Sequence, residues 1–327
     1  MIGSLQTSSG SSQSSRPGDN MPLRHLGFID LPPHAKAGGF DHAAVHEPTG
    51  RIYVAHTAND AVDVIDIATQ RYVRSIPDLP AVAGALIAEP DLVFTSNRGE
   101  NSVGIFTTAD VPGVEKIAVG VRPNGLAYDP RRSRLLVAHV GDPAIAASFT
   151  VSIIDVRARK RVADVAVAGR TRWAVYDPSS DAFHVNIADP PQIVVVESGD
   201  PVRIRRIAQI PHAGPHGLDI DVANRRLFCA SDAGVLAVVD ADTGKVRESH
   251  PIAGVPDVVF YNAVLQQLYV AIGEPGVIEV FDAARLGRRE TVSTEHGAHT
   301  LSFDAKRNIV CAFLPGTHRA AVYEDNA

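Results

Sequence analysis

The feature that most constrains this chain is a pattern of apolar strand, turn and apolar strand that recurs along nearly its whole length. It is plain in the stretch NGLAYDPRRSRLLVAH, where two apolar runs flank an Asp-Pro turn. Successive copies start roughly 40 to 48 residues apart, which is the length of a four-stranded unit in repeat proteins. Seven copies fit the chain, and they open at His42, Gly84, Asn124, Arg172, His216, Asp257 and His299.

The strands within each copy alternate or run apolar, as in VDVID, VSIID and LAVVD, and helical periodicity is nowhere sustained. We therefore predict an all-β fold, a seven-bladed β-propeller of four-stranded antiparallel blades. The seventh copy ends after three strands. The segment HLGFIDL, from His25 to Leu31, has the composition of a strand. We predict that this N-terminal strand closes the last blade and protects its edge.

The stretch VGVRPNGLAYDPRRSRLLVAH has a Gly and a Pro before the inner strand, Asp-Pro after it and small residues at the end of the next strand. It resembles the repeat of the YVTN/YncE-like propellers, and the resemblance covers residues 24–325. It implies a seven-bladed propeller. Because that architecture serves lyases, lactonases, isomerases, electron-transfer partners and interaction modules, the fold alone predicts no function.

Composition narrows the class of partner. The 327 residues are 45% hydrophobic and 21% charged, with a formal net charge of -6, so we expect no basic face and no nucleic-acid partner. No apolar run approaches the ~18 residues of a membrane span, and no secretory signal opens the sequence. We therefore expect no membrane partner and a cytoplasmic location. The Ser- and Gly-rich residues 1–21 are expected to form a disordered leader, followed by a single domain over residues 22–327.

Two residue types that suggest chemistry have structural explanations. Cys229 and Cys311 take a register that valines hold in other copies, so we interpret them as apolar fillers in a reducing compartment. Several aspartates end a third strand just before a turn, where the side chain can bond to the turn backbone. These aspartates are Asp66, Asp155, Asp240 and Asp282.

The thirteen histidines are mostly placed at one mouth of the predicted propeller. If each inner strand runs away from that mouth, the second strand returns to it, so the first residue of a copy and the end of its second strand lie together. The opening position supplies His42, His216 and His299 as predicted metal ligands. His56 and His139, at the ends of second strands, are predicted as a fourth ligand or an outer partner.

Imidazole nitrogens suit first-row transition metals, so the predicted cofactor is a divalent ion of Zn, Cu, Fe, Ni or Mn. The alternative is that these histidines line the channel and bond to backbone and water. No local metal motif, such as HExxH or CxxC, decides between the two.

The same mouth carries side chains suited to a small substrate. Arg172 can bind a carboxylate or phosphate bidentately, and Asp257 can act as a base or a ligand, so both are predicted catalytic residues. Arg172, Trp173, Asn124 and Asn186 form the predicted substrate-binding set. Arg172 and Trp173 have structural alternatives, an ion pair of Arg172 with Asp257 or a loop carboxylate and packing of Trp173 between blades.

Three functional hypotheses follow. The first is a metal-dependent enzyme of the lyase, isomerase or lactone hydrolase type that acts on a small anionic substrate at the histidine-lined mouth. The second is a non-catalytic propeller that presents its faces to a protein partner. The third is a copper-type redox site. The sequence contains no GxSxG elbow, P-loop or dinucleotide-binding glycine motif, which argues against those chemistries.

Overall fold

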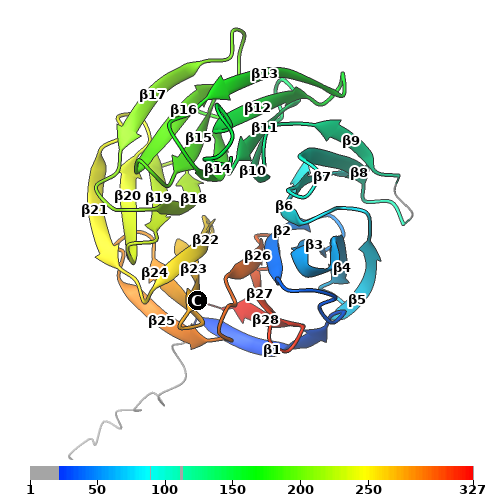
Figure 1. Cartoon of the computed structure of the whole chain (residues 1–327). Coiled ribbons are helices and arrows are strands. Elements are labelled where there is room, and N and C mark those ends of the chain that lie inside the picture. Colours follow the sequence, from blue (N-terminus) through cyan, green and yellow to red (C-terminus); the bar gives the residue numbers. More distant parts are fainter. Residues whose placement is uncertain (1–21, 89, 111–112, 327) are drawn as a thin grey trace, which may run out of the picture.

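The computed structural model describes residues 22–88, 90–110 and 113–326. They form seven four-stranded antiparallel sheets around a central axis, as Figure 1 shows. The one helix in these ranges is a 3-10 turn at Thr57–Asn59. No helix in this part of the chain has the length and apolar character to cross a membrane. The predicted seven-bladed propeller is confirmed, while the leader predicted for residues 1–21 lies outside the described residues.

Each of the first six blades consists of four consecutive strands, the first of which is innermost (Figure 1). Blades one to three contain β2 (Phe40–His46), β3 (Arg51–His56), β4 (Ala61–Asp66), β5 (Arg71–Ile76), β6 (Val82–Ala88), β7 (Leu92–Asn97), β8 (Ser102–Thr107), β9 (Glu115–Ala118), β10 (Pro123–Asp129), β11 (Arg134–His139), β12 (Thr150–Asp155) and β13 (Lys160–Ala166). Blades four to six contain β14 (Thr171–Asp177), β15 (Ala182–Ile187), β16 (Gln192–Glu197), β17 (Ile204–Gln209), β18 (Pro215–Asp221), β19 (Arg226–Ser231), β20 (Val235–Asp240), β21 (Val246–Pro251), β22 (Val255–Asn262), β23 (Gln267–Glu274), β24 (Val277–Asp282) and β25 (Arg288–Ser293).

The seventh blade joins the two ends of the described chain. Its strand order is β1-β28-β27-β26. The four strands are β1 (Leu23–Asp30), β26 (Thr300–Asp304), β27 (Ile309–Leu314) and β28 (Arg319–Asp325). Strand β1 pairs with β28 along its length, from Leu23 opposite Asp325 to Asp30 opposite Arg319. The N-terminal strand therefore closes the last blade, as predicted.

Apolar side chains fill the space between neighbouring blades, and burying an aromatic or branched side chain stabilises the fold by roughly 1.5–3 kcal/mol. Tyr53, Phe94 and Phe228 are among the largest fully buried side chains. Cys229 and Cys311 lie in the same core, both free and fully buried. Burial raises the pKa of each thiol to about 12, which keeps it protonated and unreactive. The filler role predicted for them is confirmed.

The aspartates at the ends of third strands hold the turns that follow. Asp66 Oδ1 accepts a hydrogen bond from the backbone N–H of Thr69 at 2.9 Å, and Asp240 Oδ1 accepts one from Thr243 at 2.7 Å. Asp155 and Asp282 make the same kind of bond. The repeated aspartate is therefore a folding feature, as its repetition at one register predicted.

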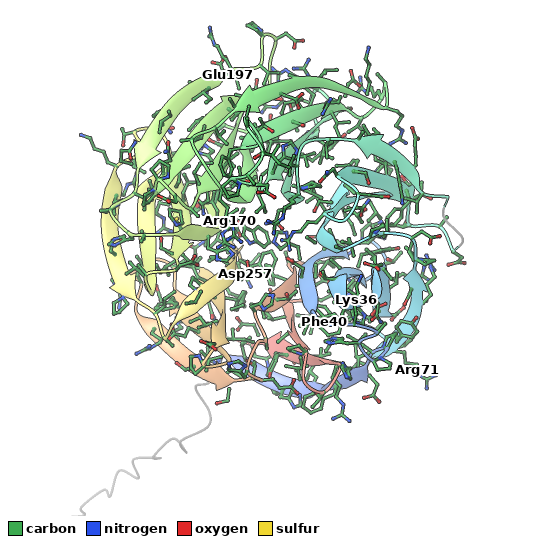
Figure 2. The ribbon with its side chains drawn as sticks, viewed as in Figure 1. Lys36, Phe40, Arg71, Arg170, Glu197 and Asp257 are labelled. Carbon is green, nitrogen blue, oxygen red and sulfur yellow. The ribbon has the colours of Figure 1, made fainter. Side chains whose placement is uncertain are left out.

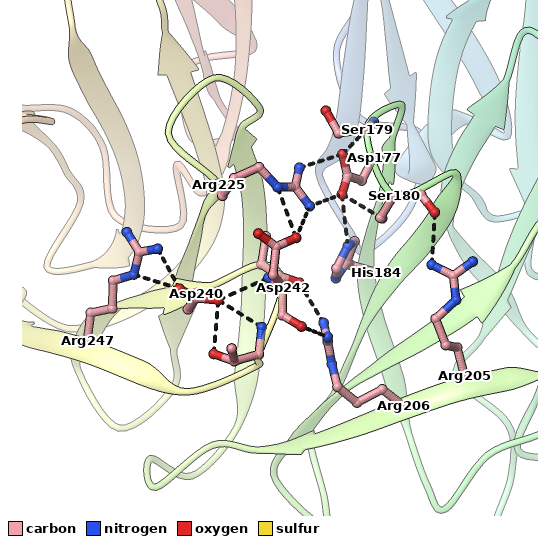
Figure 3. Close-up of polar contacts among 12 residues, drawn as sticks. Asp177, Ser179, Ser180, His184, Arg205, Arg206, Arg225, Asp240, Asp242 and Arg247 are labelled. Carbon is pink, nitrogen blue, oxygen red and sulfur yellow. Dashed lines mark hydrogen bonds and ion pairs between the residues drawn. The ribbon is translucent and has the colours of Figure 1, made fainter.

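Ion pairs tie neighbouring blades together at the far ends of the inner strands. Asp177 ends β14 in blade four, and Arg225 of blade five donates to its two oxygens at 2.9 and 2.6 Å (Figure 3). Arg225 also bonds to Asp242 at 2.8 Å. Burial alone would raise the pKa of Asp177, but its bonds to His184 and Arg225 hold that pKa well below its usual range. This carboxylate is therefore committed to holding two blades together.

Candidate functional site

The candidate site is built on a distortion that recurs where the inner strands begin. In each of the first six blades the pairing of the first and second strands shifts register just after the first residue. Such a β-bulge leaves a residue unpaired and re-aims its side chain. Phe40 pairs with His56 across this end of blade one, so the start of strand one and the end of strand two do share a mouth. The bulge residues that form the site are Asp41, His42, Asn124, Arg172, Trp173, His216 and Asp257.

His216 lies at the centre of a buried polar cluster. Its Nδ1 is 2.7 Å from Asp232 Oδ1, and its Nε2 is 3.0 Å from Asp257 Oδ1. Arg172 places Nη1 2.9 Å from the same Nε2 and Nη2 3.3 Å from Asp232 Oδ2. Both ring nitrogens of His216 are therefore engaged by protein groups.

The two carboxylates determine the charge of His216. Burial disfavours the imidazolium, yet Asp257 and Asp232 together outweigh burial and raise the pKa of His216 above its ordinary value. The nearby guanidinium of Arg172 opposes this effect only in part. His216 is thus stabilised as an imidazolium by the two carboxylates.

Asp257 is surrounded by imidazoles from three blades, those of His42, His216 and His299. Burial would raise the pKa of Asp257, but the imidazoles around it, that of His216 foremost, hold that pKa well below its usual range. Trp173 Nε1 donates to Asp257 Oδ1 at 3.4 Å, and His299 Nε2 lies 3.7 Å from Oδ2. The structure therefore brings the three opening-register histidines together, around a carboxylate.

His299 is the most open of these three imidazoles, with 37% of its side chain exposed. Its Nδ1 donates to the carbonyl oxygen of Gly297 at 2.8 Å. Because the proton of the neutral ring is fixed on Nδ1 by this bond, the lone pair lies on Nε2. An accessible ring in this tautomer is suited to accept a proton from a bound molecule.

His42 differs from the other two because it belongs to the floor of the mouth. Its ring stacks on Trp173, with centroids 4.2 Å apart. Burial lowers the pKa of His42, although Asp41 and Asp257 oppose the shift. The neutral ring and the indole separate the polar cluster from the apolar channel beyond, where Phe260 packs edge-on against Trp173.

Four arginines, Arg98, Arg122, Arg170 and Arg172, gather around the same mouth. Partial burial and the positive charges of the other three lower the pKa of Arg170. Arg98 pairs with Asp41 at 3.2 Å. Arg170 is labelled near the centre of the ring in Figure 2, and its guanidinium has no hydrogen bond or ion pair with any other described residue. It is therefore a free cation at the mouth.

His56 and His139 lie inside their own blades, fully buried. His56 Nδ1 is 2.6 Å from Asp63 Oδ2. The backbone N–H of Gly120 donates to His139 Nε2 at 3.2 Å, so the proton of the ring is on Nδ1, which bonds to Thr150 Oγ1 at 2.8 Å. Burial lowers the pKa of His139 to about 4. The structure does not bring these two histidines to the other three.

The two asparagines of the predicted substrate-binding set have protein partners. Arg98 donates to Asn124 Oδ1 at the rim of the mouth. Asn186 is fully buried, and its amide donates to the carbonyl oxygens of His216 at 3.0 Å and Gly217 at 3.2 Å. Asn186 therefore holds the bulge of blade five from blade four, and it positions His216 through its backbone.

No group of three or more His, Cys, Asp or Glu side chains within residues 22–88, 90–110 and 113–326 is arranged to hold a metal ion. The geometry of His216 agrees with this, because a guanidinium and two carboxylates already contact its nitrogens. The metal remains a prediction.

Five charged residues of the mouth are absent from the sequence-based set, namely Asp41, Arg98, Arg122, Arg170 and Asp232. Arg98 and Asp232 come directly after the ends of second strands β7 and β19, and Arg170 comes directly before inner strand β14. The sequence could have identified them, because they lie next to the strand positions that were used to place the histidines at the mouth. Neither a protein-family model nor a curated protein sequence matches the chain.

Proposed function

We propose that the chain is an enzyme of the lyase or isomerase type that binds a small carboxylate at this mouth and moves protons on it. The observation that carries the proposal is the open His299 beside the buried, carboxylate-held His216, with an unpaired arginine at the same mouth. An accessible imidazole and an imidazolium stabilised by carboxylates can serve as base and acid in one reaction.

The arginines supply the binding half of the proposal. Arg170 has no partner in the described chain, so its guanidinium is available to pair with a substrate carboxylate. Arg172 is held in place by Asp232 and can share the same anion. Bidentate guanidinium–carboxylate pairs give both affinity and orientation, which fits a substrate that must present one C–H bond to a base.

The proton path assigns one role to each of three residues. His299 Nε2 takes a proton from the carbon next to the bound carboxylate. His216, as imidazolium, returns a proton to the leaving group in an elimination or to the far carbon in an isomerisation, so the charges balance. Asp257 orients both rings. Its low pKa makes it a weak base, which favours this positioning role over the base role that the sequence suggested.

The metal-dependent form of this chemistry remains a second arrangement. A divalent ion bound by His42, His216 and His299 would have to displace Arg172 from His216 Nε2. Elemental analysis of untagged protein distinguishes the two arrangements: we expect well below one metal per chain. A stoichiometric transition metal would favour the metal-dependent enzyme, and stoichiometric copper the redox site. The finer relationship to YVTN/YncE-like propellers rests on the VGVRPNGLAYDPRRSRLLVAH stretch alone.

Proton removal can be measured before the natural substrate is known. The full chain is incubated in D₂O with malate, citrate, lactate and malonate, and loss of C–H signals is followed by NMR. We expect enzyme-dependent exchange in at least one acid. His299→Ala should slow it by about 10²–10⁴-fold, the usual contribution of a general base. Arg170→Ala should raise the concentration needed for half-maximal rate.

His250→Ala is the matched control, because His250 lies on the outer strand β21 and its side chain bonds, among the described residues, to Glu248. It should exchange at the wild-type rate. If none of the acids exchanges and none binds by calorimetry, the acid–base proposal fails and the non-catalytic interaction propeller becomes the better account.

A further inference from the structure

A second cavity lies in the channel on the other side of Trp173. It has a volume of about 560 Å³ and is lined by the inner strands of blades two to six. It extends from Trp173 to Pro130 and Pro178, which follow the far ends of β10 and β14. Cavities of this size commonly bind small molecules. We call it the lower chamber, because the polar mouth lies at the opposite end of the channel.

Among the described residues that line the lower chamber, Asp219 is the one carboxylate. Strand pairing shows which residues take its position in the other six blades, since each lies opposite the same residue of its second strand. They are Ala44, Leu86, Ala127, Val175, Phe260 and Ser302. Five of them are apolar and none is charged, so the fold itself does not require a charged side chain at this position.

The local bonds of Asp219 leave it without a cation. Oδ1 accepts the backbone N–H of Ile220 at 2.8 Å, and Oδ2 accepts that of Tyr261 at 2.7 Å. No charged side chain in the described part of the chain adds to these bonds: burial raises the pKa of Asp219 to about 6, and only the two backbone N–H groups oppose that shift. Near neutral pH the chamber therefore contains an ionised carboxylate with free lone pairs and apolar walls.

We propose that the lower chamber binds an organic cation, a protonated amine with an apolar or aromatic body, whose ammonium group pairs with Asp219. The apolar lining would hold the body of the ligand. Trp173, Tyr128, Tyr176 and Phe260 contribute aromatic faces, which attract cations as well as apolar groups. An anion would be repelled by Asp219, and a neutral molecule of the same shape would lose the ion pair.

This site is separate from the proposed function. It uses none of the arginines or histidines of the mouth, and the two ligand classes have opposite charge. Failure of either proposal therefore leaves the other standing. Trp173 is the single tryptophan of the chain and borders both regions, so its fluorescence reports on the occupant.

The test compares three probes of nearly the same shape, 4-phenylbutylamine, 4-phenyl-1-butanol and 4-phenylbutyrate, by calorimetry on the full chain at about pH 7.5. We expect the amine to bind at least about ten-fold more tightly than the alcohol, and the butyrate most weakly. At about pH 5 the amine should bind roughly ten-fold more weakly, because Asp219 must then lose a proton on binding. Alcohol binding should not change with pH.

Two variants isolate the carboxylate. Asp219→Asn keeps the shape, and Asp219→Val introduces the residue that blade four has at this position. Both should lower amine affinity to that of the alcohol and abolish its pH dependence, while retained alcohol binding reports an intact chamber. Asp257→Asn, at the mouth, should leave amine binding as in the wild type. The proposal is overturned if the wild type does not prefer the amine, or if the preference survives in either Asp219 variant.

Discussion

His216 and Asp219 lie three positions apart on β18, and the pKa of each is raised for a different reason. Burial opposes the charged form of His216, and Asp257 and Asp232 more than compensate for it. Burial acts almost alone on Asp219, where it also disfavours the charged form. One strand therefore presents a stabilised charge to the mouth and a destabilised charge to the lower chamber.

Asp219 gives the folded chain a measurable dependence on pH. Its pKa is about 6 in the fold and 3.8 in the reference state, so the folded chain binds the proton more tightly. Its protonation stabilises the fold at low pH, and this stability is lost as pH rises from about 4 to about 6. We expect the free energy of unfolding of the wild type, relative to Asp219→Val, to be about 2 kcal/mol greater at pH 4.5 than at pH 7.5.

Urea denaturation of both proteins at the two pH values measures this difference. A common loss or gain from other groups cancels in the comparison. A difference that stays constant with pH would show that the Asp219 carboxyl titrates normally, and the lower chamber would then be wetter than its lining implies.

At the scale of the element, β1 decides whether the ring is stable. Ile29 on β1 is buried in the same core cluster as Val322 of β28. Removal of residues 22–33 would expose this apolar surface and leave β28 as a free edge. We expect the truncated chain to melt at least about 10 °C lower or to aggregate. Removal of residues 1–21 alone, which leaves every described strand intact, is the control for thermal melting; equal melting temperatures for both truncations would contradict the closure.

The elements were largely predictable, because strand periodicity and turn residues report on local geometry. The blade number, the closing strand and the turn role of Asp66 could all be derived in this way. The bulge could not. The opening register assigned His42 to the position of His216, but strand pairing gives that position to Asp41 and places His42 level with Trp173. Because the spacing between copies already varies by several residues, one unpaired residue cannot be detected from the repeat.

The candidate site was predictable only in part for the same reason. The topology predicts that the opening histidines converge. It does not predict the direction of side chains at strand ends. Asn186 was therefore predicted to line the mouth, whereas its side chain bonds to the backbone of the next blade. Asp232 and Arg98 lie in loops, where sequence period gives no facing rule. Their roles depend on the ion pairs that they form in the folded chain, Arg98 with Asp41 and Asp232 with Arg172.

At the scale of the whole molecule, the mouth does not share the net negative charge of the chain. The chain carries a formal charge of -6, whereas the mouth has four arginines against the carboxylates of Asp41, Asp232 and Asp257. An anion is therefore attracted at short range only, and salt should screen that attraction because the Debye length falls from roughly 10 Å at 0.1 M to roughly 3 Å at 1 M.

Citrate titrated calorimetrically should accordingly bind at least several-fold more weakly in about 1 M than in about 0.1 M NaCl. Arg170→Ala should weaken binding at the lower salt and reduce the salt effect. If citrate affinity does not respond to salt or to this variant, the arginines are not the anion site. The neutral 4-phenyl-1-butanol is the control, since its binding involves no charge.

Because β1 pairs with β28, the ring can close only late in translation. Arg24 and Glu324, which form an ion pair across this seam, are 300 residues apart. The first strand leaves the ribosome with no partner and stays unpaired until the last strand has been translated, while the blades between them can already form. A stop codon before β28 would therefore leave β1 without the strand that it pairs with.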